Sequence, residues 1–229
     1  MLIIHDARIP EEATCRLQQY GKTIPFMSQD IVPKPVAGHP DIFLCQVDDQ
    51  LIIAPDIFET YHHLLKSSNF KLLKGKSSLK NSQNKPVYYN AVITDDLIIH
   101  HKNFTDEIIL ENSGNRKYIH VNQAFTRCSL LPLKDNRFIT SDRGIEKQLL
   151  IEGFDCLYVN PRKIILPGYA YGLIGGCMGV SNQNLFIIGN VKNIDNPTQF
   201  VDFVEKSGYT IVELYGGSLF DGGGLIIHD

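Results

Sequence analysis

The sequence lacks the features of a secreted protein, of a protein stabilised by a structural zinc ion, and of a membrane-spanning protein. Its five cysteines are scattered along the chain, and no two of them form a Cys-x-x-Cys pair. This pattern argues against a disulfide framework and against a structural zinc site, and it is typical of a reducing cytoplasm. No stretch approaches the roughly 18 apolar residues of a membrane span, and the first residues lack the basic segment of a signal peptide. We therefore expect a cytoplasmic protein that has no membrane partner.

The chain also lacks an excess of positive charge. Its formal net charge is −3 and its pI is near 6.2, so nothing predicts a nucleic-acid partner. A hydrophobic fraction of 43% and a charged fraction of 21% are typical of a globular protein. We expect residues 1–229 to form one domain, and the sequence does not indicate an oligomeric state.

What the chain does contain is an internal repeat of about 46 residues. Four short apolar stretches follow polar turns rich in Asp and Asn, at 51–53, 97–99, 138–139 and 185–188. Another apolar stretch precedes each turn, at 42–47, 91–93, 129–133 and 179–180. Acidic and amide side chains suit tight turns, so each pair predicts a β-hairpin.

Each hairpin is followed by a helical pattern and then by a third apolar stretch. The predicted helices are 57–66, 105–112, 144–151 and 198–206, and the third strands are 70–73, 117–121, 156–159 and 210–214. Gly114 and Gly153 stand just after two of these helices, where glycine adopts the left-handed conformation without strain. The repeating unit is therefore strand–strand–helix–strand.

The two ends of the chain supply a fifth unit. Residues 2–4, 10–20 and 23–27 read as a second strand, a helix and a third strand, and 219–228 reads as the missing first strand. When residue 229 is followed by residue 1 in the count, the five units account for every residue of the chain. The sequence predicts an α/β fold, a five-bladed α/β propeller of five ββαβ repeats whose ring is closed by the N- and C-termini, because closure removes exposed strand edges. The alternative is an α+β sandwich whose strands recur by chance.

In a closed propeller the first strands line the central axis, so the residues before them converge. These residues include His39 and Asp41, Asn90, Arg127 with Cys128, Cys177, and Asp221, and several lie beside glycines. Histidine, aspartate and cysteine together suit catalysis by a thiol nucleophile. A neighbouring arginine is expected to lower the pKa of the Cys128 thiol, and only the thiolate attacks.

Three of these segments resemble motifs of the pentein superfamily, which includes arginine and agmatine deiminases, dimethylarginine hydrolases and amidinotransferases. Gly38-His39-Pro40-Asp41 resembles the family's His-x-Asp segment, and residues 220–227 resemble its Phe-Glu-Gly-Gly-Asp strand. Arg127-Cys128-Ser129 resembles the strand that carries the family's nucleophile. The resemblance in architecture covers the whole chain. Within the superfamily, the chain resembles a bacterial branch.

The resemblance implies a small guanidino or amidino substrate and no cofactor. Cys128 would be the nucleophile that forms a covalent intermediate, and His39 would be the acid and base for the leaving amine and for water. Asp41 and Asp221 would bind a planar guanidinium, with Arg127 and Asn90 as further substrate-binding residues. No metal is assigned, because adjacent histidines, as at 62–63 and 100–101, point to different faces.

The sequence departs from the family at three points. Gly224 replaces the last acid of the Gly-Gly-Asp pattern, and Ala7 stands near the position of a further family glutamate. Cys128 lies in the middle of the chain, whereas the family's nucleophile lies near the C-terminus, so the resemblance requires a circular permutation. Cys177, in a Gly-Gly-Cys-Met segment, is the alternative nucleophile.

A second class of function is a catalytically silent binding module, like the ribosome anti-association factor, which has five such units. The two hypotheses predict different surroundings for Cys128. An enzyme requires Cys128, His39 and Asp221 in one polar pocket, and a silent module predicts a buried thiol among apolar neighbours. The segment 28–38, which contains two prolines, is either a lid over the site or a fixed connection.

Overall fold

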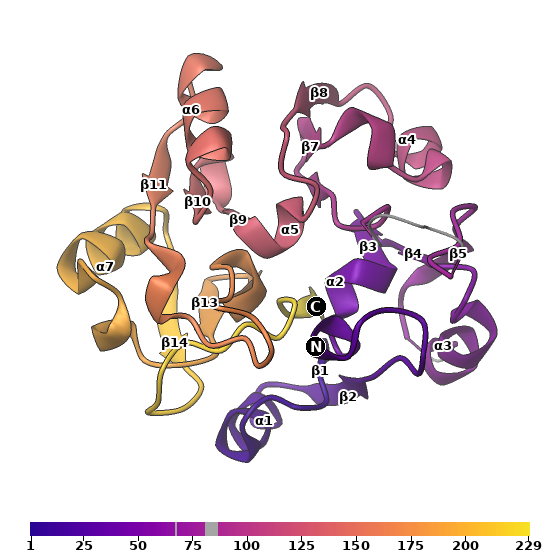
Figure 1. Cartoon of the computed structure of the whole chain (residues 1–229), viewed down its shortest axis with the longest axis horizontal. Helices are drawn as coiled ribbons and strands as arrows, with labels where there is room; N and C mark the ends of the chain where they lie inside the picture. The colour runs from indigo at the N-terminus through magenta and orange to yellow at the C-terminus, as the bar shows by residue number, and fades with distance from the viewer. Residues whose placement is uncertain (67, 81–86) are drawn as a thin grey trace.

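Five small sheets surround a central axis, as Figure 1 shows. The computed structural model describes residues 1–66, 68–80 and 87–229. Each sheet has three strands, and in each the middle strand pairs antiparallel with the first and parallel with the third. The predicted five-bladed α/β propeller of ββαβ units is therefore confirmed.

The strands follow the predicted order, with shifted ends. The first strands are β3 (Leu44–Val47), β6 (Val92–Ile93), β9 (Leu130–Pro132), β12 (Met178–Ser181) and β15 (Ile226–His228). The second strands are β4 (Gln50–Ile53), β7 (Leu97–His100), β10 (Phe138–Thr140), β13 (Asn184–Ile187) and β1 (Leu2–Asp6). The third strands are β5 (Lys71–Lys74), β8 (Lys117–His120), β11 (Cys156–Tyr158), β14 (Thr210–Glu213) and β2 (Lys22–Phe26).

The ring closes where the two ends of the chain meet. β15 pairs antiparallel with β1, placing Leu2 opposite His228 and Ile4 opposite Ile226. The letters N and C in Figure 1 accordingly lie close together near the centre of the ring. One blade is thus built from both ends of the chain, as the repeat predicted.

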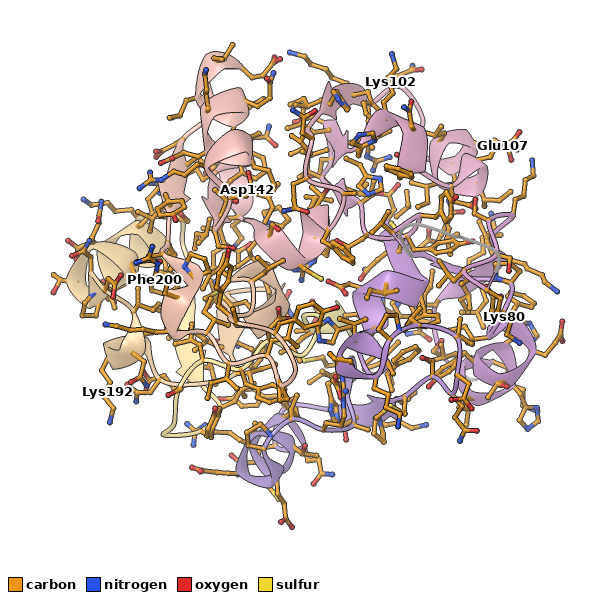
Figure 2. All side chains as sticks on the ribbon, in the orientation of Figure 1. Lys80, Lys102, Glu107, Asp142, Lys192 and Phe200 are labelled. Carbon is orange, nitrogen blue, oxygen red and sulfur yellow. The ribbon has the colours of Figure 1, made fainter. Side chains whose placement is uncertain are left out.

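One helix of each blade lies at the outside of the ring (Figure 1). These helices are α1 (Glu11–Leu17), α3 (Phe58–Leu65), α4 (Glu107–Asn112), α6 (Arg143–Ile151) and α7 (Pro197–Lys206). Figure 2 shows Lys80, Lys102 and Lys192 at the rim and Phe200 on the inner side of α7. Phe200 is 1% exposed and packs into one of four hydrophobic clusters between helices and sheets. Ile109 of α4, in contrast, belongs to a cluster with Ile52 and Ile53 of the neighbouring blade, so the outer helices also join adjacent blades.

The segments before three first strands are helical turns, so the strands predicted to begin at 42 and 129 begin at Leu44 and Leu130 instead. α2 (Pro40–Phe43) precedes β3, α5 (Thr126–Ser129) precedes β9, and the 3-10 turn η5 (Gly175–Cys177) precedes β12. Pro40 stands at the first helical position, where its missing N–H costs no hydrogen bond and its fixed φ suits a helix. The turns α2 and α5 lie next to the centre of the ring (Figure 1).

The other 3-10 turns are short connections outside the axis: η1 (Lys34–Val36), η2 (Lys102–Phe104), η3 (Lys134–Asn136), η4 (Pro161–Lys163) and η6 (Val191–Asn193). Within the part of the chain that the structure describes, every helix is too short or too polar to span a lipid bilayer.

Candidate active site

Cys128 lies on the turn α5, with polar groups on two sides of its sulfur. Its thiol Sγ–H donates to Asp41 Oδ2 over 2.8 Å. Asn90 Nδ2 donates to Sγ over 3.4 Å, and Asn90 Oδ1 accepts the backbone N–H of Cys128 over 3.2 Å. The residue is 3% exposed. Its neighbours are polar, which is the environment that the enzyme hypothesis predicts and the silent module does not.

His39 precedes α2 and carries two ring nitrogens without hydrogen-bond partners. The side chain is 1% exposed, and both Nδ1 and Nε2 are buried. Nδ1 lies 3.9 Å from Asp221 Oδ1. A buried imidazole without partners is unusual, because most buried polar atoms find one. Its two free nitrogens are therefore available to a bound molecule or to proton transfer.

Two buried aspartates face this region from different blades. Asp41 uses Oδ2 for the thiol, and its Oδ1 has no partner. Asp221 accepts hydrogen bonds from the backbone N–H groups of Leu173 and Gly223, over 2.8 and 3.1 Å. The backbone thus fixes the Asp221 carboxylate, whereas Asp41 keeps an oxygen free for a ligand.

Glycines next to Asp221 leave no room for larger side chains. A Cβ at Gly176 would lie 1.9 Å from Asp221 Oδ1, and one at Gly172 would lie 2.5 Å from its Cβ. Gly223 has φ +68, and a Cβ there would lie 2.4 Å from Cβ of His39. The glycine-rich segments therefore permit the close packing of His39 and Asp221.

Arg127 is half-buried beside Cys128, and its guanidinium is held by backbone carbonyls. Nη1 donates to Gly175 O over 2.8 Å, and Nη2 donates to Met178 O over 3.2 Å. A Cβ at Gly224 would lie 3.1 Å from Arg127 Nη2. Gly224 therefore lies directly beside the Arg127 guanidinium, and a larger side chain at position 224 would meet it.

The burial of these groups shifts their protonation. Burial raises the pKa of Cys128 well above its ordinary value, and the charges of Asp41 and Asp221 raise it further. The expected lowering of this pKa by Arg127 is therefore wrong, because desolvation and two carboxylates outweigh the arginine. Burial also raises the pKa of Asp41 to about 6 and raises that of Asp221. The site holds a protonated thiol at rest.

The alternative nucleophile lies in a different environment. Cys177, on η5, is fully buried and donates its Sγ–H to the carbonyl of Leu173 over 3.3 Å. Burial raises its pKa well above the ordinary value, and the Asp221 charge adds to this. The thiol of Cys177 donates to a backbone carbonyl, whereas the thiol of Cys128 has a carboxylate and an amide as partners. The geometry therefore places Cys128 closer than Cys177 to groups that handle protons.

The sequence analysis missed an acid next to Ala7. Asp6 ends β1, is fully buried, and forms hydrogen bonds with the side chain of Arg8 at 2.5 to 3.2 Å. It lies at the site, since a Cβ at Gly38 would be 2.2 Å from Asp6 Oδ1 and one at Gly222 would be 3.3 Å from Asp6 Cβ. The signal available in the sequence was an aspartate at the end of an apolar strand, on the same end of the blade as the entries of the site.

Two connecting segments meet beside the site. Arg8 Nη1 and Nη2 donate to the carbonyls of Lys34 and Pro35, so the segment 28–38 is tied to Asp6. The segment 164–173 approaches it, because a Cβ at Gly168 would lie 2.7 Å from Pro35 Cγ. The first segment leads into His39 and the second donates to Asp221, so both have direct connections to the candidate site.

Cys128, His39 and Asp41 could also hold a metal ion. One ligand atom from each lies within 4.8 Å of the others, and no second group of this kind occurs among residues 1–66, 68–80 and 87–229. Thiolate, imidazole and carboxylate are the ligands that Zn²⁺ accepts in proteins. The short distances between these atoms would also allow proton transfer among them, which requires the groups to lie near one another.

Comparison with known proteins identifies relatives of this fold. A family model described as "Family of unknown function (DUF6873)" matches residues 4–226. A search of curated proteins finds no match. Among solved structures, SxtG, an amidinotransferase from Microseira wollei in the saxitoxin biosynthetic pathway, aligns with a TM-score of 0.59 and 10% identity, covering 98% of this chain and 93% of that one.

Two further structures align over most of their length. A cysteine-to-serine mutant of DDAH from Pseudomonas aeruginosa, complexed with citrulline, gives a TM-score of 0.55 at 10% identity, covering 93% of this chain and 91% of that one. Agmatine deiminase from C. jejuni gives 0.52 at 9% identity, covering 93% and 87%. The resemblance to the pentein superfamily is thereby confirmed for the fold.

Proposed function

We propose that this chain, which belongs to the family of unknown function DUF6873, is an enzyme that modifies a small guanidino or amidino compound through a covalent bond to Cys128. The observation that carries the proposal is the buried cluster in which the ligand atoms of Cys128, His39 and Asp41 lie within 4.8 Å of one another. The fold it shares with an amidinotransferase and with agmatine deiminase supports this class of reaction.

The charges of the site favour a planar cation. Asp41 and Asp221 are both buried, and each has a raised pKa because its ionised form is poorly solvated. A guanidinium would supply N–H donors and a positive charge to both carboxylates. Asp41 Oδ1, which has no partner, is the first acceptor that such a ligand would meet.

Binding of the cation would also prepare the nucleophile. Asp41 and Asp221 raise the pKa of the Cys128 thiol by their negative charge. A bound guanidinium offsets that charge, so the thiolate forms more readily once substrate is present. The enzyme thus keeps a protonated thiol until its substrate arrives.

The proposed reaction has two steps. Sγ of Cys128 bonds to the amidino carbon, its proton passes to His39, and His39 returns that proton to the leaving amine as the C–N bond breaks. Water or an amine then attacks the same carbon and gives a proton to His39. The C–S bond breaks, and the proton returns to the thiolate. Each proton released is taken up again within the cycle.

A panel of guanidino compounds tests the proposal. The wild type, with arginine, agmatine and guanidinoacetate among the probes, is expected to release ammonia or a ureido product from at least one compound. Quenched mixtures should contain a mass adduct on Cys128. If none of the compounds is turned over and no adduct forms, the enzyme hypothesis is wrong for this substrate class.

Replacement of Asp41 by asparagine should change the pH dependence of stability. The pKa of Asp41 is raised to about 6 when folded, mainly by burial. A carboxyl with a raised folded pKa stabilises the fold fully below its unfolded pKa, near 4, and loses that contribution as the pH rises through about 6. We expect the stability of Asp41→Asn relative to wild type to rise by roughly 2 kcal/mol between about pH 4 and pH 8.

Urea denaturation at several pH values measures this difference. Asparagine keeps the shape of the side chain and an oxygen that accepts the thiol of Cys128. The same variant should lose turnover, because a neutral amide attracts a guanidinium weakly. A difference in stability that stays constant across the pH range would show that Asp41 does not titrate as described.

Replacement of Arg8 should expose the nucleophile. Arg8 ties the segment 28–38 to Asp6, with 2.7 and 2.9 Å bonds to two carbonyls. Lysine retains the charge beside Asp6 but loses the paired contacts. Hydrogen bonds to charged groups are worth about 1.5–3 kcal/mol, so we expect Arg8→Lys to speed alkylation of Cys128 by iodoacetamide roughly tenfold.

Two other thiols serve as references in the same sample. Cys15 is exposed and should react at an unchanged rate, whereas Cys45 is buried and should stay unmodified unless the whole protein unfolds. Faster labelling of both Cys45 and Cys128 would mean global destabilisation. An unchanged Cys128 rate would show that the segment 28–38 is a fixed connection and not a lid.

A further inference from the structure

The side chain of Asn90 connects the two helical turns that carry Asp41 and Cys128. Its Nδ2 donates to the backbone carbonyl of Asp41, on α2, over 3.1 Å and to Sγ of Cys128, on α5, over 3.4 Å. Its Oδ1 accepts the backbone N–H of Cys128 over 3.2 Å. Asn90 is fully buried and stands just before β6, in the blade between those of α2 and α5. One amide therefore holds the two turns together.

Asn90 also caps the turn α5 from outside. The first N–H groups of a helical turn have no acceptor within the turn, and Phe125, the N-cap residue of α5, caps none of them with its side chain. The backbone carbonyl of Asn90 accepts the N–H of Arg127 over 3.0 Å, and Oδ1 accepts that of Cys128. The position of the nucleophile thus depends on a residue of the neighbouring blade.

This arrangement fixes which end of the amide faces the sulfur. Because Oδ1 accepts the N–H of Cys128, the Nδ2 end points to Sγ, and Nδ2 can only donate. A donor favours the ionised form of a thiol over the neutral form. Burial raises the pKa of Cys128 most, the charges of Asp41 and Asp221 raise it further, and the hydrogen bond from Asn90 lowers it. Among these influences, Asn90 is the one that favours the reactive form.

We propose that Asn90 positions the nucleophile and stabilises its thiolate by a hydrogen bond, and that it does not bind the substrate. The proposal rests on the proposed function, because it takes Cys128 as the nucleophile. When the proton of Sγ passes to His39, the sulfur gains a negative charge and the hydrogen bond from Nδ2 becomes charge-assisted. Nδ2 has two N–H groups and two acceptors, Asp41 O and Sγ, which leaves no donor for a ligand.

Asn90→Asp tests the proposal, because it removes the donor and keeps the acceptor. One carboxylate oxygen still accepts the N–H of Cys128, whereas the other faces Sγ without a proton to donate. We expect iodoacetamide to alkylate Cys128 at least about tenfold more slowly than in the wild type near pH 8. The midpoint of the rate against pH should rise by about one unit. A purely structural role predicts the opposite, since a loosened turn exposes the thiol, so an equal or faster rate overturns the proposal.

Asn112→Asp is the matched control. Asn112 is half-buried on α4, where its Nδ2 donates to the backbone carbonyl of Ile108 over 2.8 Å. This substitution also removes an amide donor, but it should leave the alkylation rate of Cys128 unchanged. The exposed Cys15 reports the activity of the reagent in each sample, and thermal unfolding shows that both variants are folded. If Asn112→Asp slows the alkylation of Cys128 as much, the effect is not local and the proposal is wrong.

A second measurement needs no substitution at position 90. In NMR spectra of the wild type, the side-chain N–H protons of Asn90 should exchange with D₂O at least about 100 times more slowly than those of the exposed Asn103. Cys128→Ala removes the sulfur acceptor and should speed the exchange at Asn90. Rapid exchange at Asn90 in the wild type would show that its amide is free, and this result would overturn the proposal even if Asn90→Asp does not fold.

Turnover of a guanidino compound separates this proposal from the proposed function. With an active compound, Asn90→Asp should lower kcat and leave KM nearly unchanged. A raised KM with an unchanged kcat would make Asn90 a substrate-binding residue and overturn its role at the thiol. If no compound is turned over and alkylation still slows in Asn90→Asp, the proposed function fails while the hydrogen bond from Asn90 to the thiolate stands.

Discussion

Chloroacetamidine is expected to alkylate Cys128 about 10 to 150 times faster than chloroacetamide does. The two reagents have nearly the same shape, but only the amidine is a cation. Asp41 and Asp221 would attract that cation, and hydrogen bonds to charged groups are worth about 1.5–3 kcal/mol, which corresponds to roughly this ratio. The cation also offsets the carboxylates that raise the pKa of the thiol.

Intact-mass kinetics followed by peptide mapping measures the two rates at each thiol. Cys15, which is exposed on α1, is the internal reference and should show a ratio near that of free cysteine. The isosteric variant Asp221→Asn should reduce the ratio at Cys128 about tenfold. Equal ratios at Cys128 and Cys15 would contradict a guanidinium site, and selective labelling of Cys177 would move the nucleophile to the next blade.

Replacement of Cys128 by serine should abolish nearly all turnover of a guanidino substrate. Cys128→Ser keeps a hydroxyl in place of the thiol, but the hydroxyl ionises far less readily, so we expect kcat to fall by at least about 10³. The variant should still bind substrate with a similar KM, because Asp41, Asp221 and His39 remain. A turnover rate that survives this substitution would exclude covalent catalysis by Cys128.

Gly175→Ala is expected to destabilise the protein by about 3 kcal/mol. A Cβ at Gly175 would lie 2.2 Å from the carbonyl oxygen of Arg127 and 2.9 Å from that of Cys128. These are backbone atoms of α5, so they move only if the turn itself moves. Overpacking of this kind costs about 1–3 kcal/mol, and more where backbone must shift. Urea denaturation gives the change directly.

Gly216 provides the matched control. A Cβ there would meet nothing within 4 Å, and its backbone is not in the left-handed region. Gly216→Ala should therefore change stability by no more than about 0.5 kcal/mol, or increase it slightly by restricting the unfolded chain. Equal destabilisation by both substitutions would mean that contact with α5 is not the cause.

Much of the fold followed from periodicity in the sequence. The hairpins, the outer helices and the closing strand at the chain end repeat with similar spacing, and the ring confirms that order. The helical turns α2, α5 and η5 did not follow, because three or four residues are too short to show a 3.6-residue period. Pro40, at the first helical position of α2, was the available signal.

Part of the candidate site also followed from the sequence. Equivalent positions in different blades brought Cys128, His39, Asp41 and Asn90 together, as the convergence of first strands predicted. The effect of Arg127 did not follow, since its influence on the thiol depends on burial and on two carboxylates. Protonation is set by the three-dimensional surroundings, which residue spacing does not reveal.

The pairing of β1 with β15 has a consequence for the order in which the protein assembles. During synthesis, four blades emerge with their own strands adjacent in the chain, so each can form from local contacts. β1 emerges first and its partner last, with Leu2 opposite His228. Closing such a long loop costs chain entropy and slows folding. We expect an open, four-bladed intermediate on the ribosome, whose axis closes only when the final strand docks.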